Sequence, residues 1–446
     1  MTKLLTVVNL SALIATASLA FNTLAQVNIT VDITKVLARD VSHKYGMNLN
    51  AGVDSDLNRP PGSVSLMEAL KKTGVKHLRF PGGKRSLYFS WASAPYTDAS
   101  TNYWLPGSYA NNAKNTLNFD EFMSVANQIG AQAHINVAYN PTKGLNEQLA
   151  AQWVKYANIT NNYNVKYWEI GNKMWQKDLG LNTSSLCHVV NSYSIAMKAE
   201  DPSILIGVSW YKNKLKDLIK RCGDALDYVT ISDYTTYLGS YQNYAKSNNV
   251  KLINVDEKAS KKIVISEFAP TTWQKDAEDY ANTTGKGIIN FDQIGQYLLS
   301  PNTEYANFWN THWYSLNNNM FHALDKKNNL LPVAKPMTLW EKFINDDLVH
   351  VDADNHNIVT YAAFDKVTNN LNLFIINKGN KHQCANILVN AEKTYSSSAE
   401  VNQFKGKDEW DPKPSLQQVE SVKVLNNTIE TSIPPTSISV ISLIIK

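Results

Sequence analysis

The chain has 446 residues, of which 43% are hydrophobic, 10% aromatic and 18% charged. This composition excludes a disordered chain, and no internal stretch approaches the roughly 18–20 uncharged apolar residues of a membrane-spanning helix. Lys and Arg outnumber Asp and Glu by 43 to 39 without a basic run that contains interleaved aromatics. That pattern argues against nucleic acid as the main partner.

The first 25 residues have the features of a signal peptide. Lys3 gives a short positive start, residues 4–21 are mostly apolar, and Thr23-Leu24-Ala25 offers the small residues that a signal peptidase reads. Cleavage after Ala25 leaves Gln26 as the mature start, and cleavage after residue 20 is an alternative. An N-terminal membrane anchor competes with this interpretation, but the apolar run is short and lacks a stop-transfer flank. We therefore expect an exported protein, periplasmic or extracellular, with no membrane span after cleavage.

From about residue 41 to 345 the chain alternates short apolar runs with amphipathic stretches. The runs are continuous β-branched and aromatic segments, as expected for parallel strands buried on both faces. They are Tyr45–Ala51, Val75–Pro81, Ala131–Ala138, Val165–Gly171, Ile204–Trp210, Leu226–Ser232, Lys262–Phe268 and Ala306–Trp313. Eight strand–helix units over about 300 residues predict a (β/α)8 TIM barrel. A doubly wound open sheet is the competing fold, but no GxGxxG motif follows any of the runs.

Helix signals fall between these runs. Ser65 and Glu68 form a capping box, and Gly74 ends that helix before the second strand. Another helix opens at residues 119–122, and Asn146–Ile159 places its apolar side chains on one face.

The pattern changes at about residue 346, and residues 346–446 are predicted to form a β-sandwich domain. Strand-like runs there are separated by turn residues, and helical periodicity is absent. These runs are Asn357–Phe364, Leu371–Asn377, Ala385–Val389, Val422–Leu425 and Ser437–Ile445. The run Val27–Val36, within residues 26–40, is also strand-like, and we expect it to join this sandwich. The fold class is thus α/β, with a barrel over 41–345.

Cysteine and histidine usage gives no metal signature. Cys187, Cys222 and Cys384 match no zinc or CxxC spacing, and the nine His residues include no HExxH motif. Export would permit a Cys187–Cys222 disulfide, but three cysteines leave one thiol over, and the pairing stays open. We expect neither a metal nor another cofactor.

Three strand ends carry the residues that could perform chemistry. Active sites of such barrels lie at the carboxyl ends of the strands. The second strand ends in the sequence LRFPGG at residues 78–83, the fourth in YWEIGNK at 167–173, and the seventh in ISEF at 265–268.

These segments resemble those of the retaining (β/α)8 glycoside hydrolases, especially the α-L-arabinofuranosidase-like members. The resemblance extends to FDEFMSVANQIGAQ ahead of the third strand, AAQWVKYANIT ahead of the fourth, and PPTSISVISLII at the end of the sandwich. It covers the order of motifs from about residue 41 onward. It implies an oligosaccharide or polysaccharide as the partner.

Retaining glycosidases use two carboxyl groups about 5 Å apart, one as nucleophile and one as acid and then base. By resemblance, Glu267 matches the nucleophile, and Asn172 matches the residue that hydrogen-bonds the sugar 2-hydroxyl. Arg79 matches the arginine that keeps the nucleophile ionised, because a nearby cation lowers the pKa of a carboxyl group.

The sequence departs from the family at position 173. The family's acid/base is the Glu that directly follows Gly-Asn, and this chain has Lys173 there. A lysine ammonium is a poor proton donor to a leaving oxygen at pH 7, and an ion pair with Glu267 would blunt the nucleophile. Glu169 is a candidate to replace the missing carboxyl group, but we interpret it as part of a buried polar layer of the barrel.

A second departure lies at the end of the sixth strand. The family often has Ser-x-His-Tyr there, whereas this chain has Ser232-Asp233-Tyr234. Ser232 or Asp233 takes the place of the substrate-facing His, depending on register, and Tyr234 is expected to reach the site.

Side chains near the strand ends could also bind a sugar. Trp175 and Trp313 are candidates to stack on sugar rings. Three more tryptophans lie near strand ends, namely Trp91, Trp104 and Trp273, and we expect about half of the five to serve packing instead. Lys84 and Arg85, together with Lys173, could receive an acidic sugar, although solvated loop charges are the more common case.

Two functions fit these observations. One is an exported glycosidase that keeps Glu267 as nucleophile and has altered acid/base catalysis. The other is a pseudoglycosidase that binds a glycan without cleaving it. Two further alternatives, an aldolase-like barrel with Lys173 as Schiff-base nucleophile and a polysaccharide lyase with Lys173 at a uronate, fit the surrounding motifs less well. The sugar, the linkage, the endo or exo mode and the oligomeric state are not encoded in any motif that we recognise.

Overall fold

We describe the fold from a computed structural model of the chain. The structure describes residues 26–107, 115–234, 240–247, 260–273, 277–313, 320–344, 347–390 and 395–446. The predicted signal peptide, residues 1–25, lies outside these ranges. Within them, no helix combines the length and the apolar character that crossing a membrane requires.

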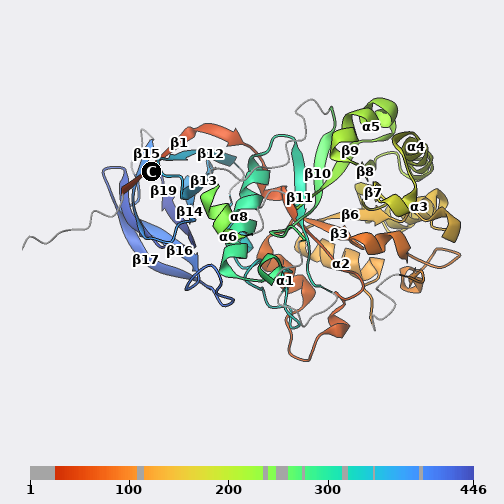
Figure 1. Cartoon of the computed structure of the whole chain (residues 1–446), viewed down its shortest axis with the longest axis horizontal. Coiled ribbons are helices and arrows are strands. Elements are labelled where there is room, and N and C mark those ends of the chain that lie inside the picture. The colour runs from red at the N-terminus through yellow and green to blue at the C-terminus, as the bar shows by residue number, and fades with distance from the viewer. Residues whose placement is uncertain are drawn as a thin grey trace, which may run out of the picture.

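A closed parallel barrel forms one half of the molecule (Figure 1). In the described residues its strands are hydrogen-bonded in the order β10-β11-β2-β3-β6-β7-β8-β9, and β9 pairs with β10 to close the ring. The strands are β2 (Tyr45–Asn48), β3 (His77–Phe80), β6 (Gln132–Val137), β7 (Tyr167–Ile170), β8 (Leu205–Ser209), β9 (Tyr228–Asp233), β10 (Lys262–Phe268) and β11 (Thr303–Phe308). The predicted TIM barrel is therefore confirmed. A short hairpin of β4 (Phe89–Ser90) and β5 (Tyr103–Trp104) follows β3.

Helices connect these strands and cover the barrel. They are α1 (Leu66–Thr73), α2 (Phe119–Ile129), α3 (Glu147–Val154), α4 (Thr183–Glu200), α5 (Leu215–Cys222), α6 (Tyr241–Lys246), α7 (Ala277–Tyr280), α8 (Thr284–Leu299) and α9 (Met337–Phe343). Ser65 and Glu68 form the predicted capping box of α1, and Gly74 ends that helix with φ of 69°. The helix predicted over Asn146–Ile159 is α3, which continues as a π-helix over Lys155–Thr160.

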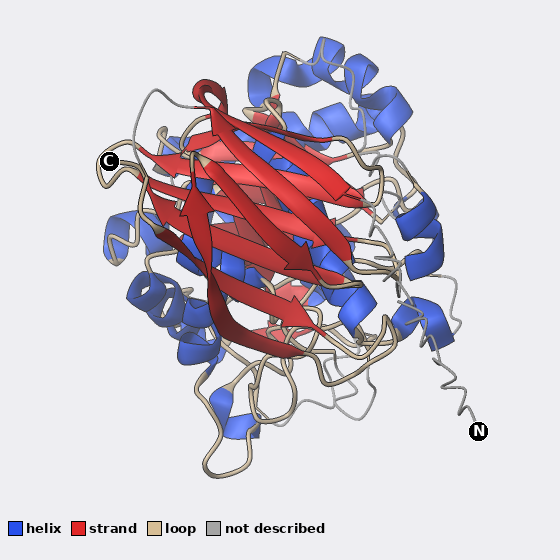
Figure 2. Cartoon of the chain, turned by 90° about the vertical axis from the view of Figure 1, so that its left-hand side faces the viewer, coloured by secondary structure: helices blue, strands red, loops and turns tan. Residues whose placement is uncertain are grey.

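The second half of the molecule is an all-β domain (Figure 2). Its strands are β1 (Gln26–Ala38), β12 (Asp347–Ala353), β13 (Ile358–Asp365), β14 (Asn370–Asn377), β15 (Gln383–Asn390), β16 (Ser398–Lys405), β17 (Ser415–Leu425), β18 (Thr428–Ile433) and β19 (Ser437–Ile444). Hydrogen bonds link them in the order β1-β12-β13-β14-β19-β16-β17-β18-β15, and β15 pairs with β1. The N-terminal strand β1 is antiparallel to β12 and parallel to β15, so it joins this domain as predicted.

Some strand bounds differ from the sequence prediction. The prediction missed β12, β16 and β18, because their apolar residues alternate with polar ones or are few. In β16 the side chains of Asn402 and Gln403 are buried although they are polar. The last barrel strand was predicted over Ala306–Trp313, but β11 spans Thr303–Phe308. The chain leaves the barrel after Phe308, and the backbone N–H of Thr311 already bonds the carbonyl of Asn48.

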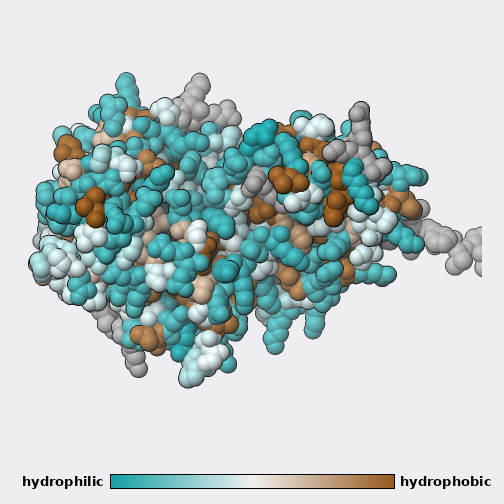
Figure 3. Space-filling model, turned by 180° about the vertical axis from the view of Figure 1, so that it is seen from behind, coloured by the Kyte–Doolittle hydropathy of each residue, from teal (hydrophilic) through white to brown (hydrophobic). Residues whose placement is uncertain are grey.

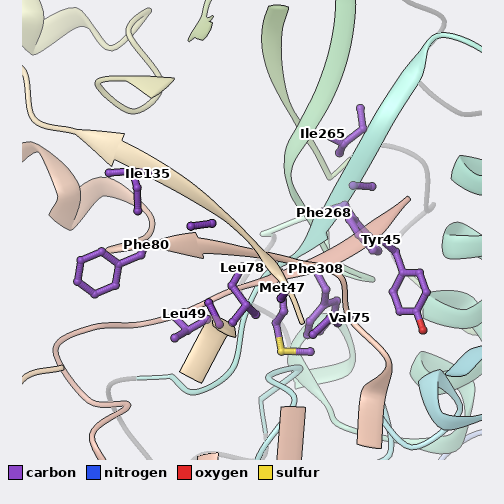
Figure 4. Close-up of a cluster of buried hydrophobic side chains, with 14 of the residues drawn as sticks. Tyr45, Met47, Leu49, Val75, Leu78, Phe80, Ile135, Ile265, Phe268 and Phe308 are labelled. Carbon is purple, nitrogen blue, oxygen red and sulfur yellow. The ribbon is translucent and has the colours of Figure 1, made fainter. Parts of the chain in front are cut away.

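The two faces of the barrel strands differ in chemistry. Apolar side chains of the strands form a buried cluster (Figure 4). The labelled members are Tyr45, Met47, Leu49, Val75, Leu78, Phe80, Ile135, Ile265, Phe268 and Phe308. Polar side chains alternate with them and are equally buried, for example Asn48, Arg79, His134, Glu169 and Thr230. Because Arg79 of β3 and Thr230 of β9 both donate to Glu169 of β7, this polar set occupies the barrel interior.

The two halves pack through α8 and α9. Trp340 of α9 stacks on Phe291 of α8 with ring centroids 4.4 Å apart, and it lies 4.4 Å from the ring of Phe374 on β14. Figure 1 shows α8 between the barrel and the sandwich. Seen from behind, the surface is mostly hydrophilic, with apolar residues in small separate patches (Figure 3).

A disulfide links two helices on the barrel. Cys187 of α4 and Cys222 at the end of α5 are bonded, which decides the pairing that the sequence left open. Cys384 on β15 is the remaining thiol in the described part of the chain.

Candidate active site

Five of the predicted site residues converge at the carboxyl end of the barrel. Lys173 Nζ lies 2.7 Å from Glu267 Oε2, and the Tyr234 hydroxyl donates to the same oxygen at 2.8 Å. Arg79 approaches Glu267 Oε1 at 3.4 Å and donates to Asn172 Oδ1 at 3.0 Å. Glu267 is thus the shared partner of two cations and one hydroxyl donor.

The backbone after β7 places Asn172 and Lys173. Gly171 and Lys173 both have positive φ, 62° and 50°, so the chain turns sharply where the strand ends. Gln176 then fixes the turn, since its side-chain amide donates to the carbonyl of Asn172 at 3.0 Å and its backbone N–H donates to the carbonyl of Lys173 at 2.9 Å. A left-handed backbone is uncommon for lysine. The hydrogen bonds of this turn hold the backbone of Lys173 in place and so set the direction in which its side chain leaves the chain.

An irregularity in β10 orients Glu267. The pairing of β10 with β9 shifts between Ile265 and Glu267, because β10 carries one residue more than β9 at this point. Such bulges are frequent beside active sites, where they redirect a side chain. Burial raises the pKa of Glu267, but Lys173 and then Arg79 outweigh it and hold the pKa below its usual range. The carboxylate is therefore ionised at neutral pH.

Glu169 belongs to a structural layer below this carboxylate. It is fully buried and accepts from Arg79 Nε at 2.7 Å and from Thr230 Oγ1 at 2.6 Å, with His134 3.3 Å away. Burial raises its pKa, but Arg79 and then His134 lower it to about 2. A carboxyl group with this pKa does not donate a proton at pH 7. Its contacts agree with the interpretation of Glu169 as part of the buried polar layer.

The register of β9 decides between Ser232 and Asp233. Thr230 and Tyr234 both bond carboxylates of the barrel interior, so Ser232, at the same two-residue spacing, faces the interior as well. Asp233 is buried on the other side, where it accepts from the hydroxyl of Tyr297 on α8 at 2.9 Å. Ser232, not Asp233, therefore faces the barrel interior, where the resemblance leads us to expect a substrate-facing side chain.

The two candidate tryptophans lie at the periphery of this site. Trp313 packs 5.9 Å from the ring of Trp273, which packs 5.2 Å from the ring of Tyr234. Trp313 thus reaches the Glu267 group through two intervening rings. Trp175 follows Lys173 in the same turn, and its carbonyl accepts from Tyr211 at 2.9 Å. Both rings are partly exposed.

Sequence reasoning missed several residues that hold the site together. Asn48 accepts from Arg79 at 3.0 Å and donates to the carbonyl of Ser266 at 2.8 Å. Thr230 and His134 fix Glu169. Asn48 and Thr230 are polar residues inside apolar runs, which is the signal that could have identified them.

The basic side chains in the loop after β3, which could receive an acidic sugar, contact polar side chains of the protein itself. Arg85 donates to Asn50 at 3.0 Å, and Lys84 Nζ lies 3.5 Å from Asp178 with both side chains more than half exposed. The described residues contain no group of three or more His, Cys, Asp or Glu side chains arranged to hold a metal.

Comparisons with known proteins place these observations in context. No family model matches the chain. The sequence is 25% identical over 190 residues to a probable α-L-arabinofuranosidase C of Aspergillus fumigatus, covering 37% of each chain. It is 28% identical over 158 residues to α-L-arabinofuranosidase C of Emericella nidulans, covering 31% of this chain and 30% of that one. The matched part therefore spans only about a third of the length of these curated relatives.

Solved structures with the same fold cover nearly the whole chain. An α-L-arabinofuranosidase from Thermotoga maritima, solved as an arabinose complex, superposes with a TM-score of 0.71 at 19% identity over 93% of this chain and 99% of that one. A family 44 xyloglucanase from Paenibacillus polymyxa superposes with a TM-score of 0.66 at 13% identity over 94% of this chain and 100% of that one. These similarities establish the barrel-plus-sandwich fold, and the sequence matches support the resemblance to (β/α)8 glycoside hydrolases.

Proposed function

We propose that this chain is an exported, glycoside hydrolase-like protein that acts on oligosaccharides or polysaccharides as an arabinofuranosidase- or xylosidase-like retaining enzyme. Its nucleophile would be Glu267, and its acid/base catalysis is altered. The observation that carries the proposal is a buried carboxylate, 1% exposed, that is kept ionised by Arg79 and Lys173 and bonded by Tyr234 at the carboxyl end of a TIM barrel.

In this mechanism Glu267 attacks the anomeric carbon and forms a glycosyl ester, which water then hydrolyses. Arg79 supports the ionised form of the nucleophile, and Tyr234 orients it through the hydrogen bond to Oε2. The side-chain amide of Asn172 accepts from Arg79 through Oδ1, while its buried Nδ2 has no partner in the described structure. That donor would satisfy a substrate hydroxyl, in line with the role that resemblance assigns to Asn172.

Lys173 limits the substrates that this mechanism can use. An ammonium is a far weaker acid than a carboxylic acid, so it does not protonate a departing sugar alkoxide efficiently at pH 7. A phenolate or another stable anion needs little protonation when it departs. We therefore expect the wild-type protein to cleave substrates with good leaving groups and to be slow on ordinary glycosides.

One contact favours the second candidate, a pseudoglycosidase that binds glycans without cleaving them. The ammonium of Lys173 lies 2.7 Å from Oε2, the oxygen that Tyr234 also bonds. If that ion pair persists when a sugar binds, Oε2 is not free to attack.

Hydrolysis of aryl glycosides distinguishes the two. We would measure phenolate release from a panel of nitrophenyl arabinofuranosides and xylosides, with wild type, Glu267→Gln and Glu169→Gln, and binding of xylan and arabinan oligosaccharides by calorimetry. Release by wild type that is lost in Glu267→Gln supports the glycosidase. Glycan binding without release from any substrate supports the pseudoglycosidase. If the wild-type protein neither releases phenolate nor binds glycans, both candidate functions are refuted.

Export has its own test. The predicted signal peptide implies that protein recovered outside the cytoplasm begins at Gln26, or at residue 21 if the alternative cleavage site is used. N-terminal sequencing of that protein gives the answer. Recovery of chains that all begin at Met1 would contradict a cleaved signal peptide.

A further inference from the structure

The charged side chains of the site balance one another. Arg79 and Lys173 supply two positive charges, and Glu169 and Glu267 supply two negative ones. The four are not equally accessible. The side chains of Arg79, Glu169 and Glu267 are at most 1% exposed, whereas that of Lys173 is 28% exposed. Lys173 is therefore the charge of this group that an incoming molecule meets.

Nucleophilic attack upsets this balance. When Glu267 forms a glycosyl ester it becomes neutral, and the group is left with a net charge of one positive. Arg79 keeps a counterion because Glu169 lies 2.7 Å away in the barrel interior. Lys173 loses its carboxylate, and Glu267 is the anion that it contacts among the described residues. A partly buried ammonium without a counterion costs free energy. Attack by Glu267 is therefore favoured when the leaving group itself carries negative charge and can pair with Lys173.

The position of Nζ is well suited to receive that charge. It lies 2.7 Å from the attacking carboxylate and 5.2 Å from the centroid of the Tyr234 ring, which holds it by a cation–π contact. The left-handed backbone at Lys173 fixes where the side chain begins. A lysine ammonium has three N–H donors and acts as a point charge toward phosphate-like anions.

From this geometry, and resting on the proposed function of the same site, we infer that the substrate is a glycosyl ester of an oxyacid, represented by a glycosyl phosphate, and that Lys173 binds the departing oxyanion. Such a substrate replaces the missing acid in two ways. Its leaving group is stable as an anion, and its phosphate carries its own proton.

The steps balance without a further reactant. A carboxylate oxygen of Glu267 forms a bond to the anomeric carbon of the glycosyl phosphate monoanion, while the bond from that carbon to the phosphate oxygen breaks. The electron pair leaves with hydrogen phosphate as a dianion, which pairs with Lys173. Water then attacks the same carbon, the ester bond breaks, and its electrons restore the Glu267 carboxylate. Hydrogen phosphate takes the proton from the water and leaves as dihydrogen phosphate.

The test compares glycosyl 1-phosphates with nitrophenyl glycosides of the same sugars. We would measure phosphate and phenolate release by wild type, Lys173→Gln, Lys173→Arg and a matched control, Lys198→Gln. Lys198 forms an ion pair with Asp227 at 2.8 Å and is 29% exposed, so it resembles Lys173 in contact and accessibility but lies on α4. We expect Lys173→Gln to lower the ratio of phosphate to phenolate release about 100-fold, as loss of one charge-stabilising donor does elsewhere. Lys173→Arg should keep much of that ratio, and Lys198→Gln should keep it fully.

Two further measurements identify the reaction. In ¹⁸O-labelled water the label should enter the sugar, because the bond at the anomeric carbon breaks, and its entry into phosphate would overturn the inference. The rate should fall as pH rises above about 6, where the phosphate monoanion loses its proton. Phenolate release that depends on Glu267, without any phosphate release, would refute the inference and leave the proposed glycosidase standing. Release of neither product would instead count against the proposed glycosidase.

Discussion

Replacing Lys173 by glutamate should convert this site into an ordinary retaining pair. The wild-type Nζ lies 2.7 Å from Glu267 Oε2, and a glutamate side chain is shorter than lysine by about one carbon–carbon bond, roughly 1.5 Å. The new carboxyl group would therefore lie about 4–5 Å from Glu267, close to the roughly 5 Å of retaining glycosidases.

In this variant the local charges should make the new carboxyl group the acid and Glu267 the nucleophile. Of two carboxyl groups this close, one takes up a proton because both cannot ionise easily. Arg79 lies 3.4 Å from Glu267 and keeps that group ionised, so the new carboxyl group carries the proton and becomes the acid. General acid/base assistance is worth about 100- to 10,000-fold, and the gain should be largest for poor leaving groups.

The assay is kcat/KM across glycosides whose leaving groups differ in acidity, from nitrophenol to a simple alcohol. Wild type and the control Lys173→Gln should show a steep dependence on leaving-group acidity, and Lys173→Glu a shallow one with new activity on alkyl glycosides. Efficient hydrolysis of alkyl glycosides or ordinary oligosaccharides by wild type would show that the acid lies elsewhere, and Glu169→Gln would be the next variant. An inert Lys173→Glu that still binds glycans would favour the pseudoglycosidase.

Three further predictions concern stability, each measured by urea unfolding. Arg79→Met leaves the buried carboxylate of Glu169 without its cation, so it should lower the free energy of unfolding by about 3–5 kcal/mol. Adding Glu169→Gln should restore part of that loss. An unchanged urea midpoint in Arg79→Met would contradict the buried ion pair. The pKa of Glu169, about 2 when folded, lies below its unfolded value of about 4.3, so its stabilisation, on the order of 3 kcal/mol, is complete above about pH 5 and is lost as pH falls toward 2. Glu169→Gln should flatten that acid limb, and an equal slope in both proteins would refute the assignment. Reduction of Cys187–Cys222, which closes a loop with a sequence separation of 35, should lower the unfolding free energy by about 3–4 kcal/mol, whereas Cys384→Ser should change little.

The sequence contains enough to predict the barrel and the positions of the main site residues. Strand ends are marked by glycines, as at Gly82 and Gly171, and parallel strands bring their carboxyl ends to one side of the barrel. The sequence alone therefore predicts that Lys173 and Glu267 face each other. Their roles in catalysis remain predictions.

The sequence alone does not predict side-chain contacts that depend on the register between barrel strands. The resemblance predicts that Arg79 serves Glu267, yet its shortest ion pair is with Glu169, because β3 and β7 place those two side chains in the same interior layer. The choice between Ser232 and Asp233 likewise required the alternation of β9. Trp91, one of several tryptophans near strand ends, is fully buried and donates to the carbonyl of Leu149, so it packs rather than binds sugar.

The position of β1 in the sandwich has a consequence for how the chain is made. Its neighbours β12 and β15 follow only after the whole barrel, and 308 residues separate Ala38 from Asp347. At about 5–20 residues per second, a ribosome needs roughly 15–60 s to produce that interval. Throughout it, Val27, Ile29 and Val31 have no sheet to enter, although each is at most 1% exposed in the finished protein. The barrel is in effect an insertion into the sandwich, so a truncated chain that starts after Ala38 would open the ring between β12 and β15 and leave two strand edges available for aggregation.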